Sequence, residues 1–229
     1  MKNRAPSILV VNPNTNTATT DLLVSVAETT LAGSGFDIVG VTAAAGPRMI
    51  VDAEALAEAA DHTVAAALAG VAEHRPVAVI IGAFGDPGFT ELRAAIDIPV
   101  VGIGQAAVAR AASGGRRFAI ATTTGELAEP LLELVRTVCP LADFAGIFLS
   151  DSDPLMLAAD PEASVIELGK AVDDAVAAGA EAVIIGGGPL SNSARQLALR
   201  TDVVIIEPVP SAAFSVLDEL DVASPPVRA

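Results

Sequence analysis

The sequence is poor in the residues that redox, zinc and base-stacking sites use. It contains one cysteine, two histidines, seven phenylalanines, and neither tryptophan nor tyrosine. The single Cys139 cannot form a disulfide within the chain, which agrees with a reducing compartment. Two histidines without paired spacing argue against a zinc site. With so few aromatic rings, a platform for stacking nucleic-acid bases is not expected.

Positive charge is also scarce. The chain carries 13 Lys and Arg residues against 28 Asp and Glu residues, for a formal net charge of −15. A phosphate backbone or an anionic membrane would be repelled, so neither is expected as a partner. No apolar run reaches the roughly 18 residues that a membrane helix needs. The first residues lead into a short apolar strand without a signal-peptide pattern, so we expect a cytoplasmic protein.

The sequence is rich in short apolar runs, which alternate with longer helical patterns. Hydrophobic residues make up 52% of the chain. Runs that are apolar on both faces are typical of parallel strands covered by helices on both sides. The sequence therefore predicts an α/β fold. The expected strands are Ser7–Val11, Phe36–Val41, Val77–Phe84, Val100–Ile103, Phe118–Ala121, Phe144–Phe148, Ala182–Ile185 and Val203–Ile206.

The strands form two similar series. A Thr-containing turn follows the first strand of each series, NPNTNT and TTTGE, and a glycine-containing turn follows each third strand, GAFGDPG and GGGPLSNS. This diverged repeat predicts two lobes, residues 1–105 with 210–229 and residues 106–209, joined near Ala106–Gly115. The tail Asp221–Ala229 is expected to fray. Because ligands bind beyond the carboxyl ends of parallel strands, a cleft between the lobes is expected to hold the site.

The turns after the first strand of each series carry polar side chains. Asn12, Asn14 and Thr15 can donate to a carboxylate beside a helix start, but an Asx-turn with a helix cap explains them without a ligand. Three hydroxyls at 122–124 suit an anion, whereas a capping box between Thr123 and Glu126 explains part of that pattern. Because both halves carry such a turn, the pair could hold a small carboxylate or imide.

Two carboxylates stand at strand ends. Asp86 follows the third strand and Glu207 ends the last one. Each is a candidate general base, and each has a structural explanation: a turn before proline for Asp86, a salt bridge or cap for Glu207. Arg48 could pair with an anionic substrate or be simply solvated. A divalent cation held by oxygen ligands has no specific support. The run 186–189, GGGP, matches neither a P-loop nor a dinucleotide fingerprint.

Six stretches resemble the aspartate/glutamate/hydantoin racemase superfamily, and its hydantoin racemase branch most closely. They are ILVVNPNT (8–15), GPRMI (46–50), AVIIGAFGDPG (78–88), PVVGIGQAA (99–107), RFAIATTT (117–124) and EAVIIGGGPL (181–190). They occur in the expected order over nearly the whole chain. The resemblance implies two flavodoxin-like lobes, each a parallel sheet flanked by helices, with the active site between them, and a homo-oligomer.

The resemblance also implies a catalytic pair that this sequence lacks. The family's racemases use two cysteines, one on each side of the substrate's α-carbon, because inversion needs proton transfer on opposite faces. By the motif match these cysteines would stand at Ala83 and Gly187, and Cys139 matches neither position. The expected substrate-binding residues are those of the matched turns: Asn12, Asn14, Thr15, Arg48, Phe84, Gly85, Thr122, Thr123, Gly187, Gly188, Pro189 and Leu190.

Three functions follow as hypotheses. The leading one is an enzyme that acts on a hydantoin- or thiohydantoin-like ring, or on a related small carboxylate, by hydrolytic or eliminating chemistry. It would use Asp86 or Glu207, with water or a metal ion, and no organic cofactor. The second is racemisation without thiols. The third is a non-catalytic binding protein built on the racemase scaffold.

Overall fold

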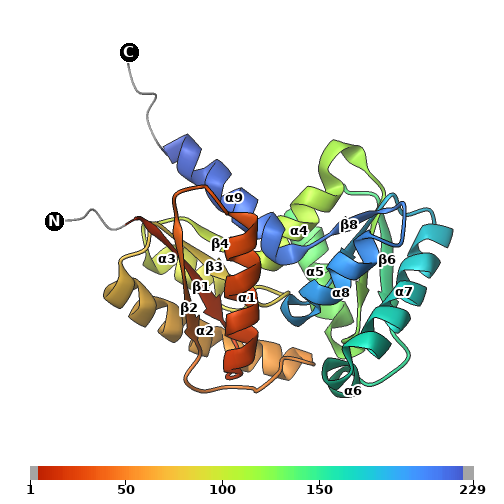
Figure 1. The fold of residues 1–229 in the computed structure, drawn as a ribbon, viewed down its shortest axis with the longest axis horizontal. Coiled ribbons are helices and arrows are strands. Elements are labelled where there is room, and N and C mark those ends of the chain that lie inside the picture. The colour runs from red at the N-terminus through yellow and green to blue at the C-terminus, as the bar shows by residue number, and fades with distance from the viewer. Residues whose placement is uncertain (1–4, 224–229) are drawn as a thin grey trace, which may run out of the picture.

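The chain folds as two parallel sheets flanked by helices. A computed structural model describes residues 5–223. Each half of the chain forms one four-stranded sheet, the first from red to yellow and the second from green to blue (Figure 1). The α/β fold with two similar sheets that the sequence predicts is thereby confirmed.

Both sheets have the same topology. The first contains β1 (Ser7–Asn12), β2 (Asp37–Thr42), β3 (Ala78–Ile81) and β4 (Val100–Gly102), in the order β2-β1-β3-β4. The second contains β5 (Phe118–Thr122), β6 (Phe144–Leu149), β7 (Ala182–Ile185) and β8 (Val204–Ile206), in the order β6-β5-β7-β8. All six pairings are parallel. The repeat inferred from the turns is therefore a repeat of topology.

Helices connect the strands. The longer ones are α1 (Thr17–Thr30), α2 (Ala53–His74), α3 (Phe89–Ala95), α4 (Ile103–Ala112), α5 (Ala128–Val138), α6 (Pro154–Ala159), α7 (Pro161–Ala177), α8 (Ser191–Ala198) and α9 (Pro208–Ala223). Three 3₁₀ turns, η1 (Ser113–Gly115), η2 (Gly125–Leu127) and η3 (Gly188–Leu190), precede or follow them. No helix in residues 5–223 is both long enough and apolar enough to span a membrane.

The two sheets share one central layer of helices. Buried side chains of α1, α4, α5 and α9 pack in a single apolar cluster with strand residues of both sheets. In β1, Ile8 and Val10 face this layer while Leu9 and Val11 face α2, since side chains alternate along a strand. Helices α2 and α3 cover the outer face of the first sheet, and α7 and α8 that of the second. One continuous core therefore sets how the two sheets face each other.

The strand predictions were correct to within one residue at most ends, and wrong at the end of the third strand. That strand was predicted to reach Phe84, but β3 ends at Ile81. The chain turns at once, and Gly85 and Asp86 adopt φ values of +128° and +51°. The predicted strand was too long because Ala83 and Phe84 are apolar, as strand residues would be. Phe84 is instead buried within the turn, at 6% exposure.

The segment Ala106–Gly115, expected as a connection, is mostly helix. Its first residues belong to α4, whose small side chains at 106, 107 and 111 are buried against the central layer. The expected lobe boundaries fall inside α4 and α9, so that division stays a prediction. Of the tail expected to fray, residues 221–223 end α9 and the rest lie outside the described residues.

Candidate functional site

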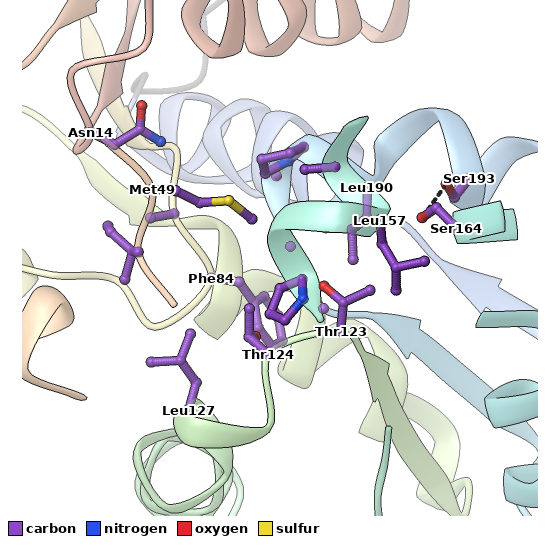
Figure 2. A pocket seen from close by; sticks show the side chains of 18 of the residues that line it. Asn14, Met49, Phe84, Thr123, Thr124, Leu127, Leu157, Ser164, Leu190 and Ser193 are labelled. Carbon is purple, nitrogen blue, oxygen red and sulfur yellow. Dashed lines mark hydrogen bonds between the residues drawn. The ribbon is translucent and has the colours of Figure 1, made fainter. Parts of the chain in front are cut away.

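A pocket opens where the carboxyl ends of the two sheets meet. Its walls come from both halves of the chain, as Figure 2 shows for the labelled side chains. The lining residues are Asn14, Met49, Ile50, Gly82, Ala83, Phe84, Thr123, Thr124, Leu127, Leu131, Pro154, Leu157, Ala158, Pro161, Ser164, Gly186, Gly187, Gly188, Pro189, Leu190, Asn192 and Ser193. Within residues 5–223, none of these carries an ionisable side chain. The pocket is thus apolar, with neutral hydrogen-bonding groups at a few points.

The glycine-containing turns after β3 and β7 both line this pocket and lie next to each other. Each is anchored in the same way: the Gly82 amide donates to the Val11 carbonyl, and the Gly186 amide to the Ala121 carbonyl, both over 2.8 Å. A Cβ on Gly188 would lie 2.9 Å from the Gly82 carbonyl oxygen, so the two turns nearly touch. The structure therefore places Ala83 and Gly187 on two neighbouring turns that line one pocket.

Three asparagines build the turn after β1. The Asn12 Oδ1 accepts from the Asn14 amide over 3.1 Å, and the Asn14 Oδ1 accepts from the Asn16 amide over 2.9 Å. Since a backbone N–H only donates, the atom of Asn14 that faces Asn16 must be its oxygen. The Asn14 Nδ2 therefore lies on the other side and donates to no described residue, and Asn14 lines the pocket. The turn therefore consists of successive Asx-turns, and it also offers the Asn14 Nδ2 as an unused hydrogen-bond donor.

The three threonines at 122–124 have different contacts. The Thr122 hydroxyl is buried and donates to the Gly186 carbonyl over 2.7 Å, which ties the first strand of the second sheet to the glycine turn. Thr123 and Thr124 line the pocket. The capping box predicted between Thr123 and Glu126 is wrong, because α5 begins only at Ala128 and its start has no side-chain cap. The Thr123 hydroxyl makes no hydrogen bond to a described residue and is free for a ligand.

Several residues predicted to bind substrate lie outside the lining. Asn12 is fully buried beneath its turn, and Gly85 follows the lining residue Phe84 without joining it. The Thr15 amide donates to the Pro47 carbonyl over 3.1 Å, so it holds the neighbouring loop. Arg48, in that loop, is exposed. Its neighbour Met49 lines the pocket instead. The assignment of these four predicted residues, Asn12, Thr15, Arg48 and Gly85, to substrate binding stays a prediction.

Asp86 caps a helix. It is 5% exposed, its Oδ1 accepts from the Gly104 amide over 2.9 Å, and its Oδ2 from the Gln105 amide over 2.7 Å. The carboxylate thus supplies the cap that α4 lacks locally. A Cβ on Gly102 would collide with it. Asp86 therefore fixes the β3 turn to α4, and it does not line the pocket.

Burial gives Asp86 a measurable effect on stability. Desolvation raises its pKa from 3.8 to about 7, against the two backbone hydrogen bonds, which lower it. Between about pH 4 and pH 7 the folded protein then holds a proton that the unfolded chain has lost. Stability should fall as pH rises through this window, by up to about 1.4 kcal/mol per pH unit from this group. Above pH 7 the contribution is constant.

Urea unfolding from pH 4.5 to 8 checks this expectation. Asp86→Asn keeps the acceptor for Gly104 and cannot titrate, so the difference in unfolding free energy between variant and parent should change across the window. Parallel curves for the two proteins would contradict the assignment of the buried proton to Asp86.

Glu207 lies beside Arg195, away from the pocket lining. Its Oε2 is 3.4 Å from the Arg195 Nε, close enough for an ion pair, but it makes no aligned hydrogen bond to a described residue. Burial raises the pKa of Glu207, and the Arg195 guanidinium opposes that rise. The salt bridge named as its structural explanation is present. Its catalytic role, like that of Asp86, stays a prediction.

Half of the pocket lining was missed by sequence reasoning. The missed residues come from the loop before α2, from η2 and α5, from α6 with the start of α7, and from α8. The loop before α2 and helix α6 follow β2 and β6, whose turns carry no glycine or threonine cluster. These missed residues are Met49, Ile50, Leu127, Leu131, Pro154, Leu157, Ala158, Pro161, Ser164, Asn192 and Ser193. The rule that ligands bind beyond strand ends could have drawn attention to the segment after β6. In residues 5–223, no three His, Cys, Asp or Glu side chains gather as a metal site would require.

Comparisons with known proteins agree on one family. The family model described as Asp/Glu/Hydantoin racemase matches residues 8–216. A hydantoin racemase of Paenarthrobacter aurescens is 31% identical over 206 residues, which cover 90% of this chain and 87% of that protein. The structure of an allantoin racemase from Klebsiella pneumoniae matches with a TM-score of 0.88 at 27% identity, covering 96% of this chain and 89% of that one. An allantoin racemase from Pseudomonas fluorescens matches with a TM-score of 0.88 at 24% identity, over 95% and 92%.

Proposed function

Because the chain belongs to the Asp/Glu/hydantoin racemase family, we propose that it binds a hydantoin-type ring between its sheets and inverts the ring's C5 stereocentre. The observation that carries the proposal is the pair of glycine-containing turns after β3 and β7, which bring Ala83 and Gly187 into the lining of one pocket. Relatives are named for hydantoin and for allantoin, and both compounds contain the same five-membered ring with an acidic C5–H.

The neutral donors of the pocket suit this ring. A hydantoin has two carbonyl acceptors and two N–H donors and is uncharged before reaction. Asn14 offers its Nδ2, and Thr123 offers a hydroxyl that can donate or accept. The backbone amides of Ala83 and Gly187 donate to no described residue, and both residues line the pocket, so in this proposal they are further donors to the ring. These groups match a neutral imide better than a dicarboxylate, because no Lys or Arg among residues 5–223 lines the pocket.

Donors placed at a ring carbonyl would accelerate loss of the C5 proton. When that proton leaves, the C–H electron pair moves into the ring and negative charge develops on the C4 oxygen. Each well-placed donor to such an oxyanion contributes about 10²–10³ in rate. In this proposal a solvent hydroxide takes the proton and becomes water, and a water molecule returns a proton to either face. The side chains bind, orient and stabilise, and the proton carrier is solvent.

The hydrolytic or eliminating chemistry expected from the sequence is not retained. It was motivated by Asp86 and Glu207 as carboxylates in the cleft, and neither lines the pocket. The hydantoin racemase and the two allantoin racemases named above are racemases. Arylmalonate decarboxylase, at 14% identity, shares the fold alone. Stereoinversion is therefore the chemistry that the more similar relatives support. The homo-oligomer and the cytoplasmic location stay predictions.

One observation favours a second candidate, a binding protein without turnover. Within residues 5–223, no side chain that titrates near neutral pH lines the pocket. General acid–base groups contribute typically about 10²–10⁴ in rate, and a pocket without them can still recognise the ring.

Proton NMR in D₂O separates these candidates. The purified protein is mixed with single enantiomers of 5-substituted hydantoins, and the C5–H signal is followed beside an enzyme-free sample. Racemase activity predicts faster loss of that signal with the ring intact and with both enantiomers present at the end. Tight binding without faster exchange would replace the racemase by the binding protein, and ring opening would contradict both.

A further inference from the structure

Ser164 and Ser193 form a pair of buried hydroxyls in the pocket wall. Ser164 comes from the first turn of α7 and Ser193 from the first turn of α8, and they are 2% and 5% exposed. Their oxygens lie 3.3 Å apart, and the dashed line in Figure 2 marks this hydrogen bond. Both residues line the pocket, beyond Leu157 and Leu190 as seen from Thr123. The pair is thus separate from the Asn14 and Thr123 donors.

This pair has hydrogen-bonding capacity that no described residue uses. Two hydroxyls contain two donors, and the bond between them uses one. Other buried serines behave differently: the hydroxyls of Ser191 and Ser211 donate to backbone carbonyls of their own chain segments over 2.8 and 2.7 Å. Neither Ser164 nor Ser193 makes such a bond. One O–H therefore lacks an acceptor in a buried place, where a missing bond is costly.

The surroundings of the pair restrict what can satisfy it. Leu157, Pro161 and Leu190 line the pocket beside it, and no charged side chain among residues 5–223 does so. A charged group would lose its hydration there without a partner. A carboxamide or urea carries an acceptor and a donor side by side, so it can accept from one hydroxyl and donate to the other.

We propose that Ser164 and Ser193 bind the neutral amide- or urea-like end of the substituent at C5. This inference rests on the proposed function for the position of the ring, and it narrows the substrate class. The preferred ligand is a hydantoin whose short, uncharged substituent crosses the apolar wall and ends in a hydrogen-bonding group. If the pair had only a structural role, joining α7 to α8, the protein would show no preference for a hydrogen-bonding group at the end of the C5 substituent.

Three hydantoins of nearly equal shape test this assignment by calorimetric binding. Their C5 substituents are carboxamidomethyl, isobutyl and carboxymethyl, which are neutral polar, apolar and anionic. The parent protein should bind the carboxamidomethyl compound about tenfold more tightly than the isobutyl one, through two additional hydrogen bonds. The carboxymethyl compound should bind most weakly.

Removing the hydroxyls should remove the preference. In Ser164→Ala/Ser193→Ala the affinity ratio of the carboxamidomethyl to the isobutyl compound should fall to about one. Ser211→Ala, an equally buried serine outside the pocket lining, should keep the parent's ratio.

The affinity ratio of the carboxamidomethyl to the isobutyl compound can be measured on the parent protein alone, so it tests the inference even if the double variant does not fold. Tighter binding of the isobutyl compound by the parent would overturn this inference alone. So would a ratio that survives both substitutions. Failure of all three compounds to bind would overturn the ring site of the proposed function, and this inference with it.

Discussion

Introducing cysteines at both Ala83 and Gly187 is expected to raise the rate of C5 proton exchange by about 10²–10⁴-fold, the usual contribution of general acid–base groups. The two positions line the pocket from two different turns. If C5 lies between them, one thiolate accepts the proton while the other thiol delivers another. Exchange of a single hydantoin enantiomer in D₂O, followed by NMR, measures the gain. We expect the double variant to exceed either single variant.

The matched control replaces the same two residues by serine. Serine has nearly the same size and does not ionise near neutral pH, so Ala83→Ser/Gly187→Ser should fold and bind like the cysteine pair but exchange like the parent. Gly187 is the harder position, since its φ is +157° and a Cβ there would lie 3.1 Å from the Leu190 Cδ1. Equal exchange rates for the cysteine and serine pairs, with ring binding intact, would contradict the placement of C5 between these residues.

Asn14→Asp is expected to weaken hydantoin binding by about 10–100-fold. The substitution keeps Oδ1, which accepts from the Asn16 amide and from the Asn12 Nδ2, so the turn should stay folded. It replaces only the Nδ2 that faces the pocket, and the ring carbonyl then meets an acceptor instead of a donor. Leaving a buried acceptor unpaired costs about 1–3 kcal/mol, which sets the expected range.

Asn16→Asp is the control for charge. Asn16 caps α1 through its Oδ1, which accepts from the Ala18 amide over 3.2 Å, and aspartate caps equally well. It makes the same chemical change two residues along, outside the pocket lining. Calorimetry should find its dissociation constant within about twofold of the parent's. If both variants lose affinity equally, the effect comes from added negative charge and the role given to Asn14 fails.

The fold was predictable because its signals are local. The eight apolar runs were long enough and apolar enough on both faces to identify the strands, and the recurring turns revealed the repeat. Phe84 shows the limit: its apolar side chain continued the strand pattern, while the turn at Gly85 and Asp86 depends on backbone conformations that the pattern does not encode.

The site was only partly predictable because its residues meet through tertiary structure. Asn14 and Thr123 follow first strands, so the strand-end rule identifies them from the amino-acid sequence. Asp86 looked like a cleft carboxylate, because its partners at the start of α4 lie 18 and 19 residues further along the chain. Ser164 follows the helix start at Asp160 and Pro161, and that pattern predicts a helix and no ligand. Only the packing of α7 against α8 brings it to the pocket beside Ser193.

The central claim is that a hydantoin ring is held between the two glycine-containing turns. A crystal structure of the protein with a 5-substituted hydantoin tests it most directly. We predict density for the ring with C5 between Ala83 and Gly187, and with a ring carbonyl within hydrogen-bonding distance of the Asn14 Nδ2. A ring bound elsewhere, or bound in this pocket without contact to Asn14 or Thr123, would contradict the claim.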